Sequence, residues 1–410
     1  MLYPVAELNV LHISESDAAG GAGRAAYKLH RGLNGLGHES RMLVGRKVTQ
    51  DDDIRPLKRN LVWRALDRAS GELLDLLSLQ YVFYPSSFGV LGDAWFRDAD
   101  VVQLHNLHGS YFGFTALPAL SRRRPVVWQL HDQWGMTGHV AYSLDCERWR
   151  HGCGACPYLG EYPRLRNDTT ALLWRLKNLV YDHSQLTLVV PSQWMADLVR
   201  ASPLLSRFNV RHIPTGIDLA VFKPGSQEDA RRRLRLPLDR RIVFFAAANI
   251  NERRKGLHLL AEAFRRLEDP PLLLVAGSGT VARAIETRYL GQVADEEVLA
   301  DAYRAADIFA VPTLADVLTQ TAPESIACGT PCLSFDRGGV IDVVRHLETG
   351  YLARFGDVNG IAEGLRTLLG DQELRERLQR RCREVAENEF SVDVQVRRYA
   401  ELYDELVAAA

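Results

Sequence analysis

The feature that most constrains the fold is a repeated alternation of short apolar runs with helical segments, in two series along 410 residues. The apolar runs of the first series are residues 9–14, 39–46, 101–108, 125–132, 186–192 and 209–216. Those of the second are residues 241–248, 272–276, 308–313 and 332–335. Strands that alternate with helices form parallel sheets with helices on both faces. Two such series predict an α/β protein with two doubly wound, Rossmann-like domains.

The boundary between the domains is expected where turn-forming residues interrupt the pattern. Four of them follow one another closely: Pro214, Gly216, Pro224 and Gly225. Clustered proline and glycine mark connections rather than elements. We therefore expect an N-terminal domain over residues 1–216, a C-terminal domain over residues 217–390, and a terminal helix within residues 391–410.

Composition excludes several classes of protein. The formal net charge of −1 gives no basic field, so we expect no nucleic-acid partner. Six cysteines in a chain of this length do not indicate a disulfide framework. Residues 1–9 lack a basic segment followed by an apolar core, so we expect no signal peptide and a cytoplasmic protein.

The stretch from Asp316 to Pro331 contains two carboxylates eight residues apart, Asp316 and Glu324. Thr321 is a candidate N-cap of a short helix, and Gly329 suits the position after its end. In an open α/β sheet, ligands bind at the carboxyl ends of strands, and a helix N-terminus there favours an anion. Carboxylates beside an anion site are consistent if they bind hydroxyl groups. A sugar nucleotide offers both hydroxyl groups and phosphate.

Polar residues also follow the strands of the first series. Residues 20–24 form a glycine-rich segment between the first strand and a helix expected over residues 25–36, which suits a phosphate or sugar or only tight packing. His105, His108 and His131 follow two buried runs, and a parallel sheet would bring them to one edge. A binding site and satisfied polar caps are both open interpretations of these histidines.

Three cysteines lie in an irregular segment over residues 137–163. Cys153 and Cys156 have the spacing of metal ligands, and Cys146 with His139 or His151 could complete a structural zinc site. Free thiols that pack a long loop are the equally weighted alternative.

Residues 316–324, followed by the Ala-Cys-Gly-Thr-Pro of residues 327–331, resemble the acidic-x7-Glu signature of the retaining glycosyltransferases of family 4, which have the GT-B fold. Further motifs follow in the order of that family, and they cover essentially the whole chain: Lys255-Gly256, Gly277 to Gly279, Gly338-Gly339 and Glu348 to Leu352. Residues 131–138, 145–149 and 152–157 are similar to the branch that makes colanic acid and other bacterial exopolysaccharides.

The resemblance implies two domains that face a cleft, with a C-terminal helix that crosses back to the N-terminal domain. It implies a nucleoside-diphosphate sugar donor, a saccharide or polyprenyl-linked saccharide acceptor, retention of configuration, and no required metal or other cofactor. The residues it assigns to catalysis are His131, Lys255 and Asp316. Those it assigns to the donor are Gly21, Arg254, Lys255, Gly277, Thr319, Gln320, Thr321 and Glu324. Those on the acceptor side are Gly23, Arg24, His105 and His108.

In this interpretation Lys255, assisted by Arg254, neutralises the leaving diphosphate. Glu324 accepts hydrogen bonds from the ribose, and Asp316 contacts the transferred sugar. The chain departs from the family at three positions: Asp316 replaces the usual glutamate, Asn249 an arginine, and Val140 a fourth cysteine.

Rival interpretations remain. A metal-dependent GT-A enzyme would use the Asp-x-Asp triplets at residues 51–53 or 98–100. A GT-B epimerase or phosphorylase is another enzyme, and a catalytically weakened carbohydrate-binding subunit is a rival of another class. A peripheral contact with the inner face of the cell membrane, through residues 61–79 and 81–84, competes with plain buried packing.

Overall fold

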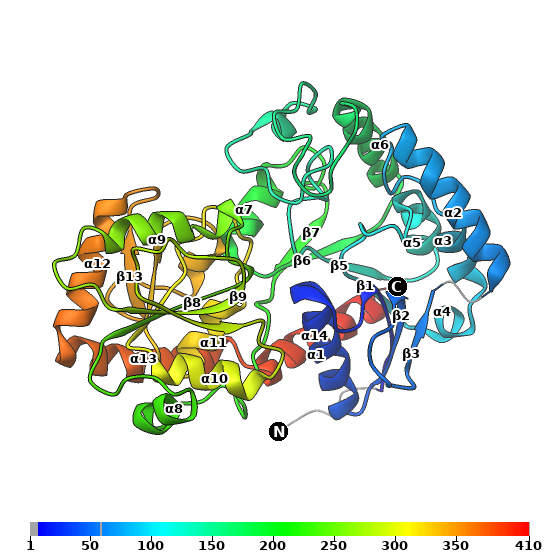
Figure 1. Ribbon diagram of the computed structural model, residues 1–410. Helices are drawn as coiled ribbons and strands as arrows, with labels where there is room; N and C mark the ends of the chain where they lie inside the picture. Colours follow the sequence, from blue (N-terminus) through cyan, green and yellow to red (C-terminus); the bar gives the residue numbers. More distant parts are fainter. Residues whose placement is uncertain (1–6, 58–59, 410) are drawn as a thin grey trace. The chain divides into compact units, whose positions relative to one another are not determined.

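The computed structural model describes residues 7–57 and 60–409, and it consists of two compact units (Figure 1). Unit 1 comprises Met1–Pro214 and Gln395–Ala410, and unit 2 comprises Thr215–Val394. Each unit is built on a parallel sheet of its own. The expectation of no signal peptide falls largely on residues 1–6, which lie outside the described residues.

The sheet of unit 1 has seven strands in the order β3-β2-β1-β4-β5-β6-β7. All its pairings are parallel. The strands are β1 (Asn9–Ser16), β2 (Glu39–Arg46), β3 (Ile54–Pro56), β4 (Val101–Leu104), β5 (Val126–Gln129), β6 (Thr187–Val190) and β7 (Asn209–His212). The edge strand β3, which has only three residues, was not predicted from the sequence.

The helices of unit 1 connect these strands. They are α1 (Gly20–Gly35), α2 (Leu61–Leu76), α3 (Pro85–Gly89), α4 (Ala94–Asp98), α5 (Leu117–Ser121), α6 (Thr170–Asp182) and α7 (Gln193–Ala201). Short 3-10 turns are η1 (Val90–Gly92), η2 (Phe114–Ala116) and η3 (Arg148–Arg150). The expected start of the first helix at residue 25 is wrong, because the glycine-rich segment already belongs to α1. Gly23 lets the backbone of this segment pack closely against the end of β1. A Cβ atom on Gly23 would lie only 3.1 Å from the Ser16 carbonyl oxygen.

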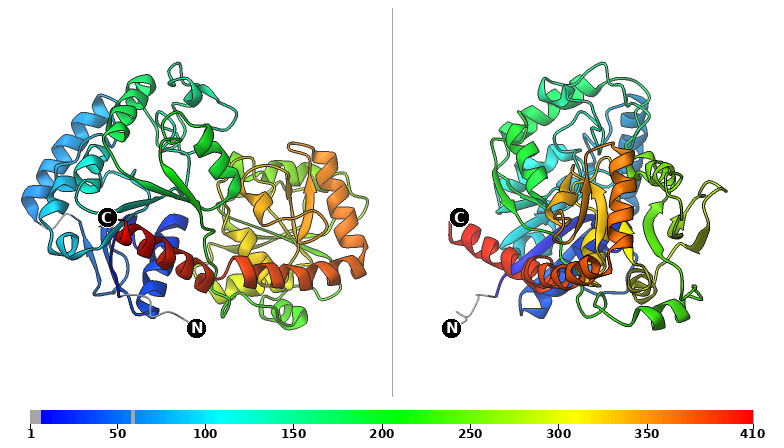
Figure 2. Two further views of the ribbon diagram at one scale, coloured as in Figure 1. Left: turned by 180° about the vertical axis from the view of Figure 1, so that it is seen from behind. Right: turned by 90° about the vertical axis from the view of Figure 1, so that its left-hand side faces the viewer.

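The C-terminal helix α14 (Val392–Ala408) returns to unit 1, as expected. Figures 1 and 2 show it beside α1. A Cβ on Gly32 of α1 would lie 2.3 Å from a methyl group of Val396, so the glycine lets the two helices approach closely. The Tyr403 hydroxyl donates a 2.8 Å hydrogen bond to the Gln103 side chain of β4.

The sheet of unit 2 has six strands in the order β10-β9-β8-β11-β12-β13, again all parallel. The strands are β8 (Ile242–Asn249), β9 (Leu272–Ser278), β10 (Thr287–Gly291), β11 (Ile308–Ala310), β12 (Cys332–Phe335) and β13 (Gly350–Ala353). The helices are α8 (Gln227–Arg233), α9 (Leu257–Phe264), α10 (Glu296–Ala305), α11 (Thr321–Ala327), α12 (Val358–Gly370) and α13 (Gln372–Glu389), with 3-10 turns η4 (Arg253–Lys255) and η5 (Gly339–Asp342).

Both faces of this sheet are buried. Along β8, Ile242 and Phe244 belong to one apolar cluster, whereas Val243 and Phe245 belong to another. A strand covered on both faces requires a continuous apolar run, which explains the sequence pattern. The expected doubly wound architecture is therefore confirmed for this unit.

Candidate functional site

Each sheet has a point where the strand order reverses. In unit 2 it lies between β8 and β11, and in unit 1 between β1 and β4. The loops that leave the carboxyl ends of two such strands diverge to opposite faces and leave a crevice for a ligand. The sequence-predicted residues Lys255 and Asp316 follow β8 and β11, and His105 follows β4.

The loops after β8 and β11 are held together by their backbones. Gly256 has a φ of +78°, and a Cβ there would lie 1.9 Å from the carbonyl oxygen of Pro312. Leu314 donates its N–H to the Arg254 carbonyl over 2.7 Å. Only glycine permits this approach, so the glycine after Lys255 has a structural reason of its own.

An ion cluster lies at this junction. The Lys255 Nζ is 2.6 Å from Asp316 Oδ2, and Nη1 of Arg254 lies 3.1 Å from the same oxygen. The Asp316 side chain is only 7% exposed. Burial raises the pKa of this carboxyl, but Lys255 and Arg254 outweigh burial and lower it below the ordinary value. Asp316 is therefore ionised at neutral pH and anchors both cations.

Lys255 retains binding capacity. An ammonium has three N–H donors, and among the described residues the hydrogen bond from Lys255 goes to Asp316 alone. Its side chain is 19% exposed. Two N–H groups can therefore reach a bound anion while Asp316 holds the third.

Asn249, which stands where the family often has an arginine, makes a hydrogen bond within its own loop. The Asn249 amide oxygen accepts the N–H of Asn251 at 3.0 Å, which shapes the loop. Of the two neighbouring arginines, Arg254 points to Asp316, whereas Arg253 is exposed. The structure thus separates two candidates that the sequence could not.

Helix α11 starts differently from the prediction. Its N-cap is Gln320, and Thr321 is the first helical residue, so the proposed cap at Thr321 is wrong. The Thr321 hydroxyl bonds to Thr319 Oγ1 at 2.8 Å instead of capping the helix. Gly329, with φ +78°, follows the C-cap as expected. A helix of seven residues supplies a weak dipole, so the cations dominate the attraction for anions here.

Glu324 is buried in α11 and accepts a 2.8 Å hydrogen bond from the hydroxyl of Tyr303. Tyr303 is fully buried in α10, and burial together with Glu324 raises the pKa of its phenol well above the ordinary value. Tyr303 was not predicted from the sequence. A polar aromatic residue on the buried face of a predicted helix was the available signal.

The glycine loops serve packing. Gly277 has φ +131°, and a Cβ there would lie 1.8 Å from the Ala247 carbonyl oxygen. Gly338 also has positive φ, and the next residue, Gly339, donates its N–H to the Asp316 carbonyl at 3.0 Å. The loop after β12 therefore fixes the backbone of Asp316.

Unit 1 gathers the three predicted histidines at one edge of its sheet. His105 Nδ1 lies 3.2 Å from His131 Nε2. His108 instead bonds through Nε2 to Asp132 Oδ2 at 2.7 Å and through Nδ1 to the Tyr162 hydroxyl at 3.1 Å. The histidines thus belong to two hydrogen-bonded groups rather than one.

His12 and Tyr162 were missed from the sequence. His12 Nδ1 lies 3.1 Å from His105 Nε2, which extends the first group into the sheet. A histidine inside the apolar run of β1 was a signal of a buried partner. Burial lowers the pKa of His131 to about 4, and it lowers those of His12 and His105 well below the ordinary value. All three imidazoles are neutral at pH 7.

The residues predicted at the start of α1 differ in exposure. Gly21 and Arg24 are exposed, and Gly23 is buried. Asp17, just before the helix, accepts N–H groups from Val48 and Thr49 at 2.8 Å each and fixes the loop.

The predicted zinc site has no complete ligand set. Cys146, Cys153 and Cys156 line one small cavity with His139, whose Nε2 lies 3.4 Å from the Cys156 sulfur. Cys153 accepts the N–H of Gly138 at 3.2 Å, and burial raises the pKa of its thiol to about 11. Within residues 7–57 and 60–409, no three His, Cys, Asp or Glu side chains are placed to hold a metal ion. The three cysteines are free thiols.

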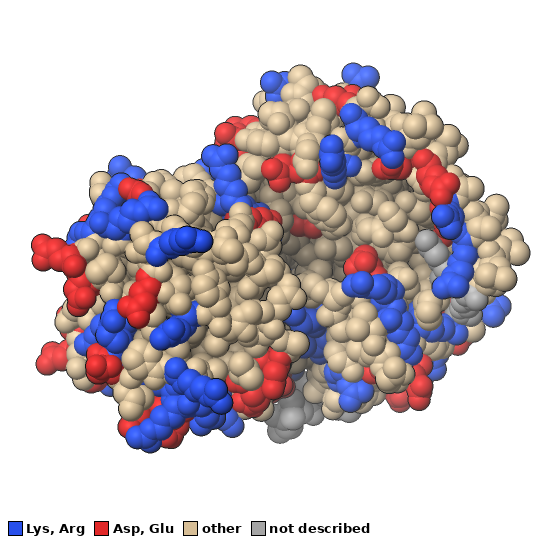
Figure 3. Space-filling view, viewed as in Figure 1, with Lys and Arg blue, Asp and Glu red and all other residues tan. Residues whose placement is uncertain are grey.

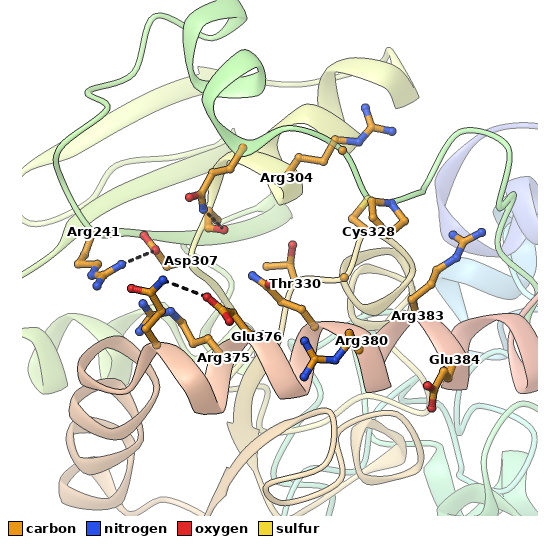
Figure 4. A pocket seen from close by; sticks show the side chains of 17 residues that line it. Arg241, Arg304, Asp307, Cys328, Thr330, Arg375, Glu376, Arg380, Arg383 and Glu384 are labelled. Carbon is orange, nitrogen blue, oxygen red and sulfur yellow. Dashed lines mark hydrogen bonds and ion pairs between the residues drawn. The ribbon is translucent and has the colours of Figure 1, made fainter.

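A second cavity, of about 660 Å³, opens on unit 2 away from the loops that follow β8 and β11 (Figure 4). It is lined by Arg241 and Asp307, which precede β8 and β11, and by α13 residues including Arg375 and Arg380. Its position at the amino ends of the strands separates it from Lys255 and Asp316.

Figure 3 shows basic and acidic side chains interspersed on the surface, without a continuous basic area on the face drawn.

Comparison with known proteins identifies the family. The family described as "Glycosyltransferase Family 4" matches residues 19–221, and the family described as "Glycosyl transferases group 1" matches residues 226–385. A D-inositol 3-phosphate glycosyltransferase of Corynebacterium efficiens is 32% identical over 324 residues, which cover 70% of this chain and 74% of the relative. The chain belongs to the group 1, family 4 glycosyltransferases.

Other relatives align less completely with this family 4 chain. A D-inositol 3-phosphate glycosyltransferase of Stackebrandtia nassauensis is 28% identical over 278 residues, which cover 61% of this chain and 62% of the relative. The chain thus spans less than two-thirds of that relative. HepE of Anabaena, solved in complex with UDP-glucose, has 16% identity and a TM-score of 0.69 over 98% of this chain and 100% of that one. This likeness shows the GT-B fold.

Among the described helices, none has both the length and the apolar character needed to cross a bilayer.

Proposed function

We propose that the protein is a retaining glycosyltransferase that moves a hexose-type sugar from a nucleoside-diphosphate sugar to a saccharide or polyprenyl-linked saccharide. The observation that carries the proposal is the ion cluster of Lys255, Arg254 and Asp316 at the strand-order reversal of unit 2. Membership of the family supports the reaction class. The UDP-glucose bound to HepE makes that donor the first to test.

In the proposed reaction the anomeric C–O bond to the diphosphate breaks, and an acceptor oxygen bonds to the same face of the carbon. The acceptor proton passes to an oxygen of the leaving diphosphate. Negative charge grows on that diphosphate, so fixed cations beside it stabilise the transition state more than the ground state. Lys255 is the principal cation in this proposal, because it keeps two N–H donors beyond its bond to Asp316.

Asp316 has two roles in the proposal. Its carboxylate fixes Lys255 and Arg254, and it lies near the reacting carbon, where positive charge develops. The Asp316 side chain is one methylene shorter than the glutamate usual in the family, so its carboxylate extends less far from the backbone. The ionised state that the two cations maintain supports both roles.

Glu324 is proposed to accept hydrogen bonds from the ribose hydroxyl groups. Its hydrogen bond from the buried Tyr303 supports this, since it fixes the carboxylate in one orientation before the ligand arrives. Thr319 and Gln320 lie just before α11, and Thr321 is the first residue of the helix that carries Glu324. The first-turn N–H groups of Thr321 and Ala322 have no partner within the helix, and they are proposed to add donors for the diphosphate.

The proposed acceptor side is the edge of unit 1 that carries His105 and His108, with Gly23 and Arg24 of α1. The exposed guanidinium of Arg24 suits an anionic acceptor group, such as the diphosphate of a polyprenyl-linked saccharide. The motifs of residues 131–157 favour bacterial surface polysaccharide as the product class. We place the reaction in the cytoplasm.

A peripheral membrane contact is proposed for α2. Several outward side chains of this helix and of its C-cap, Leu77, are apolar at helical spacing: Leu61, Val62, Leu66, Leu73, Leu76 and Leu77. Leu61 is 80% exposed and Leu73 56% exposed, so these residues are not the buried core that the alternative interpretation required. Arg64 is also exposed on this helix and would favour anionic lipid headgroups, whereas the exposed Arg68 forms an ion pair with Glu72.

The decisive experiment is a transfer assay with UDP-, GDP- and ADP-sugars and lipid-linked saccharide acceptors. Lys255→Ala should lower kcat/KM by about 10²–10³-fold, the cost of removing one donor from an anion-stabilising site. Arg253→Ala is the matched control, because this exposed cation is adjacent in the chain and lies outside the ion cluster. Near-normal kcat/KM in Lys255→Ala would remove Lys255 from the mechanism. Sugar-nucleotide binding without turnover of any acceptor would favour a carbohydrate-binding subunit.

A further inference from the structure

Three imidazoles form a hydrogen-bonded chain through unit 1. His131 Nε2 lies 3.2 Å from His105 Nδ1, and His105 Nε2 lies 3.1 Å from His12 Nδ1. The rings of each pair are stacked, with centroids 5.5 and 5.4 Å apart. The three residues come from the loop after β5, the loop after β4 and the interior of β1.

The two ends of this chain differ. His12 is fully buried, and its Nε2 has no hydrogen-bond partner among the described residues. His131 is partly exposed, and its Nδ1 has no hydrogen-bond partner in the described part of the protein. The chain therefore runs from a closed end inside the sheet to an open end at its carboxyl edge.

A chain of neutral imidazoles has only two proton arrangements, because each ring carries one N–H and one lone pair. In the first, every Nδ1 is protonated, and the N–H bonds point from His12 towards His131 and outward. In the second, every Nε2 is protonated, and the last N–H is buried at His12 without an acceptor. Neutral rings are consistent with the lowered pKa values of all three residues.

Electrostatics favour the first arrangement. It turns the positive end of the chain towards the open edge, where the Asp132 carboxylate acts on His131 and raises its pKa against the effect of burial. The second arrangement would direct the positive end towards the ring of His30, 6.1 Å from that of His12, and would leave the buried N–H of His12 Nε2 without an acceptor among the described residues.

We propose that His105 and His12 are positioning residues that hold neutral His131 in its Nδ1-protonated form, so that it presents a fixed N–H donor to an oxygen of a substrate bound at this edge of unit 1. The part of this proposal that concerns the ligand rests on the proposed function. The part that concerns the tautomer rests on unit 1 alone. A neutral donor stabilises developing negative charge without depending on protonation at physiological pH.

The tautomer is tested first in the unliganded full chain by NMR with 15N-labelled histidine. Protonated and unprotonated ring nitrogens have well-separated chemical shifts, and His131→Gln, His105→Asn and His12→Gln variants assign the signals. We expect His131, His105 and His12 to carry the proton on Nδ1, with scalar coupling across both N···N hydrogen bonds. A proton on His131 Nε2, or a mixture of the two forms, would overturn the proposal.

The positioning role is tested with two substitutions of His105. His105→Phe removes the bond to His131, and it should leave His131 as a mixture of tautomers and lower kcat/KM by about 10–100-fold, the range found when a metal-bound histidine loses the partner that orients it. His105→Asn places an amide N–H near the position of Nδ1 and should restore both the Nδ1-protonated signal and most of the activity. His183→Gln, which replaces an exposed histidine at the C-cap of α6, is the control.

The outcomes separate the proposal from the proposed function. An unchanged tautomer and unchanged kcat/KM in His105→Phe would refute the positioning role. If this variant fails to fold, the wild-type tautomer spectrum still decides the arrangement. If no donor supports transfer, the NMR result stands by itself, and the proposed function fails instead.

Discussion

Replacing Tyr303 by phenylalanine is the sharpest probe of the nucleotide-side geometry. The substitution removes one oxygen and leaves the ring, which is fully buried and packs against the rings of Phe244 and Phe309, each with its centroid 5.1 Å away. It deletes the 2.8 Å hydrogen bond to Glu324. A hydrogen bond to a charged group contributes about 1.5–3 kcal/mol to stability. We expect Tyr303→Phe to lower the free energy of unfolding by about that amount.

The corresponding change in melting temperature follows from the size of the unit. Unit 2 has about 180 residues, for which 1 kcal/mol shifts Tm by about 2–4 °C, so the expected fall is about 3–12 °C. Thermal unfolding by calorimetry measures it. Nucleotide affinity, measured by titration calorimetry with UDP, should weaken in Tyr303→Phe and weaken more in Glu324→Ala.

The chain supplies a matched control in Tyr399. This tyrosine is also fully buried, but its hydroxyl has no hydrogen-bond partner among the described residues. Tyr399→Phe removes the same atom from an unsatisfied position, so stability should stay constant or rise. Equal Tm values for the two variants would refute the contribution assigned to the hydrogen bond. Unchanged UDP affinity in Glu324→Ala would refute the ribose assignment.

Three further predictions follow from the site and the surface. EDTA should leave transfer unchanged, because protein cations serve the diphosphate, and complete loss that Mn²⁺ restores would favour a GT-A mechanism instead. Stability should be constant above pH 6.5 and fall as pH drops from 6.5 towards 4, because the unfolded chain binds a proton there that folded His131, with its pKa lowered to about 4, does not. His131 alone accounts for about 3 kcal/mol of that loss, and urea midpoints across this pH range should vary less in His131→Gln. Liposome flotation with anionic vesicles should capture the wild-type chain but not a Leu66→Glu/Leu73→Glu variant, with Leu238→Glu in unit 2 as the control; no wild-type binding at low salt would count against the membrane contact.

The central strands were predictable because their signal is local. β2 and β12 have the bounds that their apolar runs indicated, and β8 differs by one residue at each end. Of the four edge strands, β7 was predicted, whereas β3, β10 and β13 were missed. β10 shows why: most of its residues are polar or exposed, and it becomes a strand only through pairing with β9.

Parts of the candidate site were predictable for the same reason. Lys255, Asp316 and Glu324 stand at fixed spacings in segments that follow recognisable strands, so the order of motifs located them. Thr321 shows the limit of this approach. A threonine before a helical run satisfies the N-cap pattern, but the backbone begins the helix one residue earlier and the hydroxyl bonds to Thr319 instead.

The sequence by itself determined the class of fold, the two sheets and the residue types at their carboxyl ends, because periodicity and motif spacing are properties of neighbouring residues. Only the tertiary structure decided which of these residues act together. It joined Lys255 to Asp316 across 61 positions and His12 to His105 across 93. Such pairings depend on strand order and loop closure, and their energy comes from burial and charge in a shared environment. No local pattern encodes that environment.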